Sequence, residues 1–343
     1  MLKIAYIGNG KSANRYHIPF ALKSGRVTIK TIYARHLTSP WAKVEGVHYT
    51  NDLNDIYNDA ELDLVVVTTP SAFHYQYAKE ALQHGHNVLV EKPFARTVAQ
   101  AQELFDLANA KGLFLMAYQN RRFDSDFLTV QKVIESGKLG QILEVEDNYD
   151  YFRPVVPQGQ TELQWTESFL YTHACHTVDQ ILSYFGHPND VHYDVRQLLG
   201  PGRMNDYFDL DLHYDQLKVS IRSSYFRLKS RPSFAVYGTK GVFIKQTEDQ
   251  QEHDLKHFYL PGNDHPDFGV DTPDQYGTLT YVADDGIYHE EKVVSEVGDY
   301  SRVYEAVYQS LVHGAPKLVK DEETLAQLKI LETGFKQLKQ GLR

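Results

Sequence analysis

The segment at residues 3–13 reads KIAYIGNGKSA and is the stretch that decides the fold. Its apolar first half predicts a buried strand, and the second half has the spacing G-x-G-x-x-A at the start of a helix. Gly8 permits a tight turn, Gly10 lets the backbone approach a pyrophosphate, and the small Ala13 lets the helix pack close to the strand. The helix start then presents free amides to the phosphates. We predict a dinucleotide site here, formed by Gly8, Gly10, Lys11, Ser12 and Ala13.

A second motif, VLVEKP at residues 88–93, follows the same logic. The apolar run predicts another buried strand, and ligands of open α/β sheets bind at the carboxyl ends of such strands. The residue before a proline is held out of the helical region, so Lys92 sits in an extended kink that can project its ammonium group into a crevice. We predict that Lys92 takes part in catalysis. The alternative is an ordinary solvated loop lysine.

Composition limits the class of protein. A chain of 343 residues exceeds the usual size of a single core, which predicts two domains. One cysteine excludes an internal disulfide framework, and no apolar run approaches the length of a membrane span. A formal charge of -10 argues against a nucleic-acid surface. We therefore expect a soluble, cytoplasmic protein with no nucleic-acid partner and no membrane association.

Strand and helix patterns alternate as far as about residue 120, which predicts a doubly wound parallel sheet. The first expected strand is the one at residues 3–7. Further strands are expected at residues 27–33, 62–68, 88–90 and 113–117, with helices at 12–24, 73–84 and 97–111.

From about residue 140 the pattern becomes the two-residue alternation of antiparallel strands. It is seen at residues 142–146, 207–212 and 217–221, with a strand, glycine turn and return at 237–242, a loop at 253–274, and helices at 299–313 and 321–340. The predicted fold class is α/β. A Rossmann domain is expected at residues 1–121, and an α+β domain with an open, mainly antiparallel sheet at 122–343.

Six motifs in this order resemble the Gfo/Idh/MocA family of nicotinamide-dependent oxidoreductases. They are the turn at Gly8, TPSAFH at 69–74, EKP at 91–93, YQNRRF at 118–123, His176 with Asp179, and GTKG at 238–241. The resemblance implies a second domain that binds substrate and often mediates oligomerisation, hence a homo-oligomer (dimer or tetramer), and a cis peptide before Pro93. It also implies cofactor contacts from Thr69, Pro70, His74, Glu91, Lys92, Asn120 and Arg121.

The same resemblance assigns catalytic roles to Lys92, His176 and Asp179. Lys92 would lie beside the nicotinamide and stabilise the alkoxide that develops on the substrate, and Glu91 would contact the nicotinamide ribose or the lysine. His176 would exchange a proton with the substrate hydroxyl, unless it is a structural helix residue. Asp179, one helical turn further on, could orient His176, accept a substrate hydroxyl, cap a helix or form a salt bridge.

One position departs from the family pattern. The family usually has an aspartate four residues before the histidine, and here that residue is Thr172. Tyr171, His173 or Tyr149 could substitute, or the reaction could differ. His173, His176 and Asp179 share a helix face, but we expect no metal site, and we expect Cys175 to be a buried small residue.

The residues after the second expected strand bear on the choice of cofactor. NAD-selective enzymes usually place a carboxylate there, whereas this chain has YARH at residues 33–36. Arg35 could stack on the adenine and meet a 2′-phosphate, so NADP is modestly preferred over NAD. The alternative is that Arg35 is a surface residue and that either cofactor is used.

Substrate residues are suggested by an aromatic group early in the second domain. Tyr149, Tyr151, Arg153 and Trp165 could line a pocket for a polyhydroxylated small molecule, although strand aromatics often serve packing. We predict hydride exchange between NAD(P) and a hydroxyl or ketone carbon of a sugar, sugar acid or cyclitol. The alternatives are an NAD-dependent glycosidase and a non-catalytic NAD(P)-binding sensor.

Overall fold

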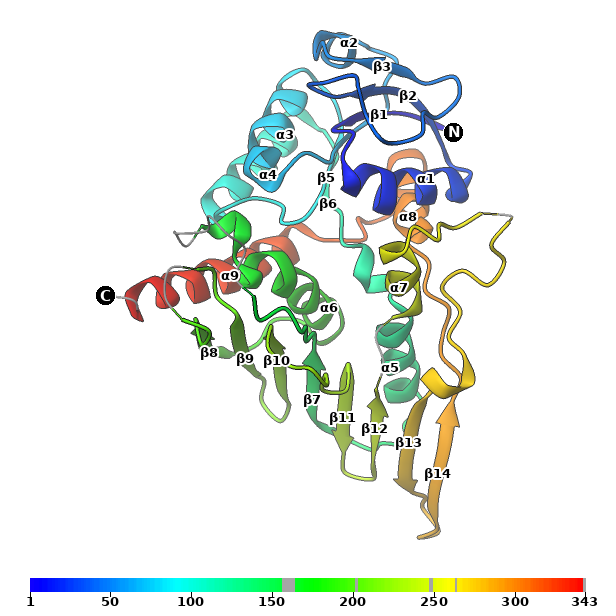
Figure 1. Ribbon diagram of the computed structural model, residues 1–343, viewed down its shortest axis with the longest axis vertical. Coiled ribbons are helices and arrows are strands. Elements are labelled where there is room, and N and C mark those ends of the chain that lie inside the picture. The colour runs from blue at the N-terminus through cyan, green and yellow to red at the C-terminus, as the bar shows by residue number, and fades with distance from the viewer. Residues whose placement is uncertain (156–163, 201–202, 247–248, 263, 342–343) are drawn as a thin grey trace. The chain divides into compact units, whose positions relative to one another are not determined.

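The computed structural model describes residues 1–155, 164–200, 203–246, 249–262 and 264–341. The chain forms two compact units (Figure 1). The first unit contains residues 1–120, 255–268 and 300–328, and the second contains 121–254, 269–299 and 329–343. The chain first passes from the first unit to the second between residues 120 and 121, beside the domain boundary expected at residue 121. Two later segments of the expected second domain belong to the first unit instead.

The first unit is built on a six-stranded parallel sheet in the order β3-β2-β1-β4-β5-β6. This is the predicted doubly wound sheet. Its strands are β1 (Leu2–Ile7), β2 (Val27–Tyr33), β3 (His48–Thr50), β4 (Leu64–Val67), β5 (Val88–Val90) and β6 (Leu115–Ala117). Strands β4, β5 and β6 are buried along their whole length, as expected for a parallel sheet with both faces covered.

The predicted helices of the first unit are present. They are η1 (Ala13–His17) with α1 (Ile18–Ser24), η2 (Ser71–Phe73) with α3 (His74–Gln83), and α4 (Val98–Lys111). The unit also contains the short helix α2 (Asn54–Tyr57). The ends of α4 show why it stops where it does. Thr97 accepts a hydrogen bond from the Gln100 amide at the start, and Gly112 adopts a left-handed conformation at the end.

Aromatic packing explains why two late segments belong to the first unit. Tyr300 and Tyr304, at the start of α8 (Ser301–His313), are fully buried. The ring of Phe20 on α1 lies 5.1 Å from that of Tyr300 and 5.9 Å from that of Phe268. Burial of these rings makes the first unit discontinuous in sequence, which a contiguous reading of the motifs did not anticipate.

The second unit is built on an eight-stranded sheet in the order β14-β13-β12-β11-β7-β10-β9-β8. Its strands are β7 (Ile142–Asn148), β8 (Asp190–Arg196), β9 (Tyr207–His213), β10 (Lys218–Ser224), β11 (Phe234–Gly238), β12 (Gly241–Lys245), β13 (Gly277–Val282) and β14 (Tyr288–Val293). Among the described strands, β7 and β10 pair in parallel, and the other neighbours are antiparallel. The sheet is therefore mixed and mainly antiparallel.

The remaining helical elements are η3 (Asn120–Phe123), α5 (Ser125–Glu135), η4 (Trp165–Glu167), η5 (Leu170–Ala174), α6 (Cys175–Phe185), α7 (Gln250–Lys256), η6 (Pro273–Gln275) and α9 (Asp321–Gly341). One expectation is corrected here. The expected loop at 253–274 begins within α7 and ends within η6. The Asp249 carboxylate accepts a hydrogen bond from the Glu252 amide at 2.8 Å, and this cap starts α7 despite the Pro, Gly and Asp residues that follow it.

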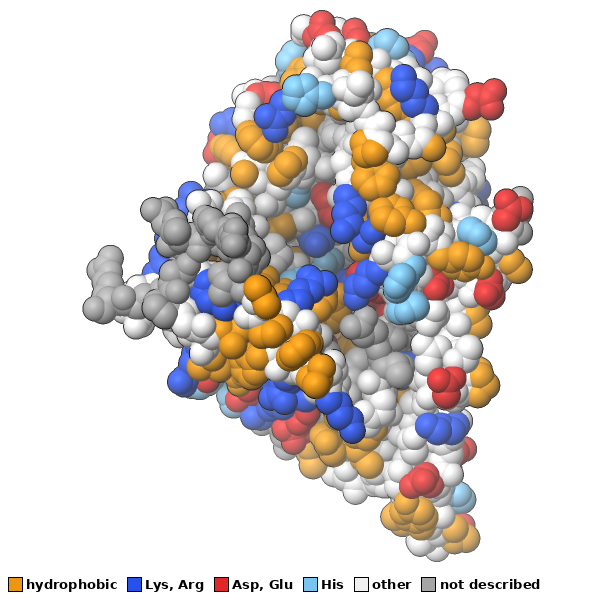
Figure 2. Space-filling model, viewed as in Figure 1, with side chains coloured by type: hydrophobic (Ala, Val, Ile, Leu, Met, Phe, Trp, Pro, Cys, Tyr) orange, Lys and Arg blue, Asp and Glu red, His pale blue; other side chains and the backbone are white. Residues whose placement is uncertain are grey.

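The surface carries both signs of charge. Figure 2 shows Lys and Arg side chains interspersed with Asp and Glu over the face in view. On the second unit's sheet, Arg222 pairs with Glu146 and Asp209 of neighbouring strands, each at 3.1 Å. No helix in the described part of the chain is long and apolar enough to cross a membrane.

Candidate active site

Gly8 brings the first turn close to β4. Its φ angle is +124°, and a Cβ placed there would lie 2.8 Å from the Thr68 carbonyl carbon and oxygen. The Gly8 amide donates to the Tyr33 carbonyl at 3.0 Å, and the Thr68 hydroxyl donates to the Gly8 carbonyl at 3.0 Å. Only glycine fits this conformation and this approach.

Gly10 has different surroundings. It is exposed, and a Cβ there would meet nothing within 4 Å. Its carbonyl accepts the Asn14 amide at 3.2 Å as the helical segment begins. The open space over this backbone fits the approach of a phosphate to the helix start, as the motif predicts.

These two glycines give a matched prediction. Gly8→Ala should lower the free energy of unfolding by about 1–3 kcal/mol, because the backbone conformation there is essentially restricted to glycine. Gly10→Ala should change stability by less than about 0.5 kcal/mol. It should nevertheless weaken nicotinamide-cofactor binding about tenfold or more, because its methyl group occupies the phosphate approach. Thermal unfolding and calorimetric titration measure the two effects, and equal cofactor affinity in wild type and Gly10→Ala would contradict the assignment.

Glu91 joins the glycine turn to the end of β5. The side chain is 6% exposed, and one oxygen accepts the Ser12 hydroxyl at 2.8 Å. The other oxygen accepts the Lys92 main-chain amide at 2.5 Å, and the Lys92–Pro93 peptide is cis. Glu91 thus holds the backbone of Lys92 in place, whereas the Lys92 side chain is partly exposed. The cis peptide that the family resemblance implied is confirmed.

His74 joins the loop after β4 to the same lysine segment. Its two ring nitrogens lie 2.8 Å from the Pro93 carbonyl oxygen and 2.7 Å from that of Thr69. Carbonyls only accept hydrogen bonds, so filling both contacts requires a proton on each nitrogen. Burial lowers the pKa of His74, while the two carbonyls and Glu91 oppose that shift. Both ring nitrogens are engaged with main-chain groups, and the expected contact with the cofactor stays a prediction.

Thr69 is a better candidate for a cofactor contact in this loop. Its hydroxyl is buried and has no hydrogen-bond partner among the described residues. A buried polar atom without a partner is costly, so a ligand hydroxyl or amide there would be stabilising. Pro70 beside it is exposed.

A buried aromatic cluster lies beneath this site and was not anticipated. His17 is fully buried, with its Nδ1 2.8 Å from the Tyr304 hydroxyl, which in turn lies 2.8 Å from the Tyr6 hydroxyl. The imidazole stacks on Tyr118, with ring centroids 3.8 Å apart. Burial lowers the pKa of His17 to about 4, although Glu91 opposes the shift.

This pKa gives the chain a definite pH dependence. Between pH 6.5 and about 4 the unfolded chain protonates His17 while the folded chain does not, so stability falls as the pH falls. The contribution amounts to roughly 3 kcal/mol over that range. His17→Phe keeps a ring against Tyr118 and should flatten this part of the stability profile. His36→Phe, at an exposed position, is the control, and denaturant unfolding at several pH values is the measurement. An unchanged slope in His17→Phe would contradict the assignment.

In the second unit, His176 lies in the first turn of α6 and lines a pocket with Tyr149 and Arg121. Asp179, one turn later, is bound by the Arg122 guanidinium through two hydrogen bonds of 2.7 Å. Both side chains of this ion pair are buried. Of the roles left open for Asp179, the salt bridge is the one that the structure shows.

Arg121 and Asn120 were expected to contact the cofactor. The Arg121 guanidinium donates hydrogen bonds to Asp124 at 2.9 Å and to the Tyr149 hydroxyl at 2.6 Å, and it forms an ion pair with Glu252 at 3.1 Å. These contacts orient Tyr149 and engage the arginine within the second unit. Asn120 is 3% exposed.

Three of the four expected substrate residues lie together. The ring of Tyr151 lies 5.2 Å from that of Tyr149, and the Arg153 guanidinium lies 4.6 Å from the Tyr151 centroid. Two further members are His173 and Tyr225, and the Tyr225 hydroxyl lies 2.5 Å from the His173 Nδ1. Tyr225 was not predicted, because it follows β10, far along the sequence.

Trp165 lies elsewhere in the second unit, with its ring 5.4 Å from that of Tyr171. Tyr171 is 1% exposed and also packs on Phe335, so it is a core residue. Thr172, at the position where the family has an aspartate, donates its hydroxyl to the Ser168 carbonyl at 3.0 Å. His173 and Tyr149 therefore remain the candidates to replace that aspartate.

Arg35 is exposed just beyond β2, where no carboxylate is present. Its guanidinium lies 5.1 Å from the Phe73 ring centroid. An arginine held against an aromatic ring can stack on an adenine or meet a phosphate. The geometry is compatible with both expected roles.

Comparison with known proteins identifies the family. Residues 2–119 match a family model described as an oxidoreductase family NAD-binding Rossmann fold, and residues 131–342 match the one described as its C-terminal alpha/beta domain. The chain belongs to the Gfo/Idh/MocA oxidoreductase family and is an NAD(P)-dependent oxidoreductase.

Several curated relatives span nearly the whole chain. It is 46% identical to the uncharacterized oxidoreductase YhhX of Escherichia coli, with 98% of this chain and 97% of that protein covered. It is 31% identical to the scyllo-inositol 2-dehydrogenase (NADP(+)) IolW of Bacillus subtilis, with 99% of this chain and 94% of that protein covered. Among solved structures, an oxidoreductase from Bacillus cereus is similar, with a TM-score of 0.92, 43% identity, and coverage of 98% and 96%.

Proposed function

We propose that the protein transfers a hydride between NAD(P) and a hydroxyl or ketone carbon of a sugar, sugar acid or cyclitol. The observation that carries this proposal is the position of Lys92 at the end of β5. Glu91 accepts hydrogen bonds from the Lys92 main-chain amide and from Ser12 in the glycine turn, and so connects the two segments. The relative IolW, named as a scyllo-inositol 2-dehydrogenase (NADP(+)), supports a cyclitol or sugar as the substrate class.

In the oxidation direction, the substrate loses a hydride from carbon and a proton from oxygen. A bound nicotinamide would supply the hydride acceptor. Lys92 stabilises the negative charge that develops on the oxygen, and His176 accepts the proton. The aromatic cluster of Tyr149, Tyr151 and His173 supplies an apolar surface edged by hydroxyl and imidazole groups, which suits a polyhydroxylated ring. We further propose that the protein acts as a cytoplasmic homo-oligomer.

Lys92→Ala and His176→Ala test these roles. Each should lower turnover on the order of 100-fold or more, because each removes a group that acts on charge or a proton in the transition state. Cofactor affinity should change little in both variants. Lys23→Ala, an exposed lysine of α1, is the matched control. Turnover is followed by reduced-nicotinamide absorbance with a panel of sugars and cyclitols. Near wild-type turnover in Lys92→Ala would refute its assignment, and the same result in His176→Ala would make that histidine structural.

We also propose that NADP is preferred over NAD, because Arg35 offers a cation where NAD-selective enzymes have a carboxylate. Arg35→Ala should weaken NADP binding about 10- to 150-fold through loss of a charge-assisted hydrogen bond. Ala34→Asp should shift the preference toward NAD, because a carboxylate repels the 2′-phosphate. Calorimetric titration of both cofactors is the measurement. Equal affinity of the wild type for NAD and NADP, or equal losses in Arg35→Ala, would overturn the preference.

A further inference from the structure

One pocket of the second unit carries more carboxyl groups than cations. It lies at the carboxyl end of β7, between residues of α5, α6 and the segment leading into α7. Among the described residues, two guanidinium groups line it, those of Arg121 and Arg231. Six carboxyl groups line it, those of Asp124, Asp126, Asp147, Asp150, Asp249 and Glu252. His176 lines the same pocket.

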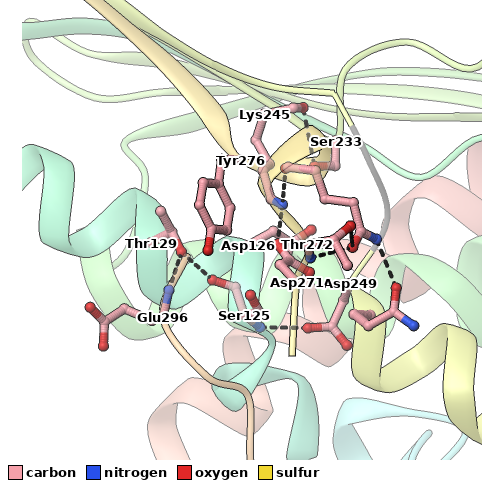
Figure 3. A network of polar contacts seen from close by, with 12 residues as sticks. Ser125, Asp126, Thr129, Ser233, Lys245, Asp249, Asp271, Thr272, Tyr276 and Glu296 are labelled. Atoms are coloured by element: carbon pink, nitrogen blue, oxygen red, sulfur yellow. Dashed lines mark hydrogen bonds and ion pairs between the residues drawn. The ribbon is translucent and has the colours of Figure 1, made fainter. Parts of the chain in front are cut away.

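The nearby cations are already engaged with particular carboxylates. Arg231 donates hydrogen bonds to both oxygens of Asp150, at 2.7 and 2.9 Å. Arg121 forms ion pairs with Asp124 and Glu252. Lys245 of β12 is fully buried and pairs with Asp271, as Figure 3 shows. The Lys245 ammonium also donates to the Gln275 carbonyl at 2.6 Å.

Three carboxyl groups then remain without an ion-pair partner among the described residues: Asp126, Asp147 and Asp249. Asp249 accepts the Ser125 amide at 2.5 Å (Figure 3) and the Glu252 amide, and Asp126 accepts the Phe127 amide at 2.8 Å. Asp147 differs from both. Its Oδ2 is buried and has no hydrogen-bond partner in the described part of the chain.

The neighbouring side chain adds a second acceptor of the same kind. The Asn148 amide nitrogen donates to the Pro232 carbonyl at 3.0 Å, which fixes the orientation of the side chain. Its Oδ1 is buried and, like Asp147 Oδ2, lacks a donor among the described residues. Asp147 is 3% exposed and Asn148 is 5% exposed, and both line the pocket. Buried acceptors without donors are costly, so a ligand rich in donors is favoured here.

The chemistry of these acceptors selects one class of ligand. No group of three or more acidic, histidine or cysteine side chains in the described ranges is arranged to hold a metal ion. A ligand that is entirely acceptor in character, such as a phosphate or carboxylate, would be repelled by the surrounding carboxylates. A primary ammonium group carries a positive charge and three hydrogen-bond donors. It can therefore pair with the negative charge of the pocket and donate to the acceptors that lack a donor.

We propose that this pocket binds the ammonium group of an aminated substrate, such as an amino sugar or amino polyol, through Asp147. The proposal rests on the proposed oxidoreductase function and narrows its substrate class. Burial raises the pKa of Asp147, and the charges of Asp126 and Asp124 raise it further. An ammonium ion beside Asp147 would stabilise the ionised form that burial disfavours.

Matched pairs of ligands test the preference. The probes are D-glucosamine against D-glucose and ethanolamine against ethylene glycol, titrated at equal ionic strength into the intact protein with NADP present. Each pair differs in one ammonium-for-hydroxyl replacement. We expect the aminated member to bind about tenfold tighter or more in at least one pair. No preference for the amine in either pair overturns the proposal.

Two variants show whether the preference arises in this pocket. Asp147→Asn removes the charge and nearly preserves the shape, and it should abolish the preference for the amine. Glu144→Gln, on the same strand and outside the pocket lining, should retain it. Thermal unfolding verifies that both variants fold. A preference that survives in Asp147→Asn places the amine elsewhere and refutes the assignment.

Turnover separates this proposal from the function on which it rests. Reduced-nicotinamide formation is measured with the same four probes and with neutral polyols. Oxidation of neutral polyols together with no preference for amines would support the proposed function and contradict the amine site. Amine-selective binding that depends on Asp147, without oxidation of any substrate, would support the site and contradict the function.

Discussion

The two hydrogen bonds accepted by Glu91 are the constraint on which the first unit's site depends. One binds the Ser12 hydroxyl in the dinucleotide turn, and the other binds the Lys92 amide at the end of β5. A buried carboxylate with two donors keeps its charge at lower cost than an unpartnered one. Through it, the glycine turn at residues 8–13 and the segment that carries Lys92 are joined by hydrogen bonds. His74 adds a second tie, from Pro93 to the loop that carries Thr69.

In the second unit, several of the buried carboxylates described above are paired with arginine side chains. Arg122 neutralises Asp179 with bidentate geometry, and Arg231 does the same for Asp150. Such pairs position side chains, because a planar guanidinium fixes both carboxylate oxygens. Among the described residues, Asp147 Oδ2 and Asn148 Oδ1 have no hydrogen-bond donor. The same pocket contains His176, a residue type suited to proton exchange. Buried polar groups left incomplete in this way are more typical of binding sites than of structural cores.

Local patterns predicted the parts of the structure that depend on neighbouring residues. The glycine turn, Lys92 and β2 follow from spacing and periodicity over a few residues, and the structure has the predicted turn and strands. Contacts between segments that are far apart in the sequence could not be predicted from such local patterns. The burial of Tyr300 against Phe20, the Arg122–Asp179 pair and the pocket around Asp147 each join segments tens of residues or more apart. The short strand β3, with the sequence HYT, has too little periodicity to be recognised.

The central claim is that the protein exchanges a hydride between a carbinol carbon and the nicotinamide as net chemistry. A direct measurement uses substrates deuterated at the carbinol carbons, incubated with the intact protein and NADP, with mass spectrometry of both cofactor and product. The account predicts one deuterium in the reduced cofactor for each ketone formed. Glycoside cleavage over many turnovers with no net reduction of the cofactor, or tight cofactor binding without deuterium transfer from any substrate, would contradict it.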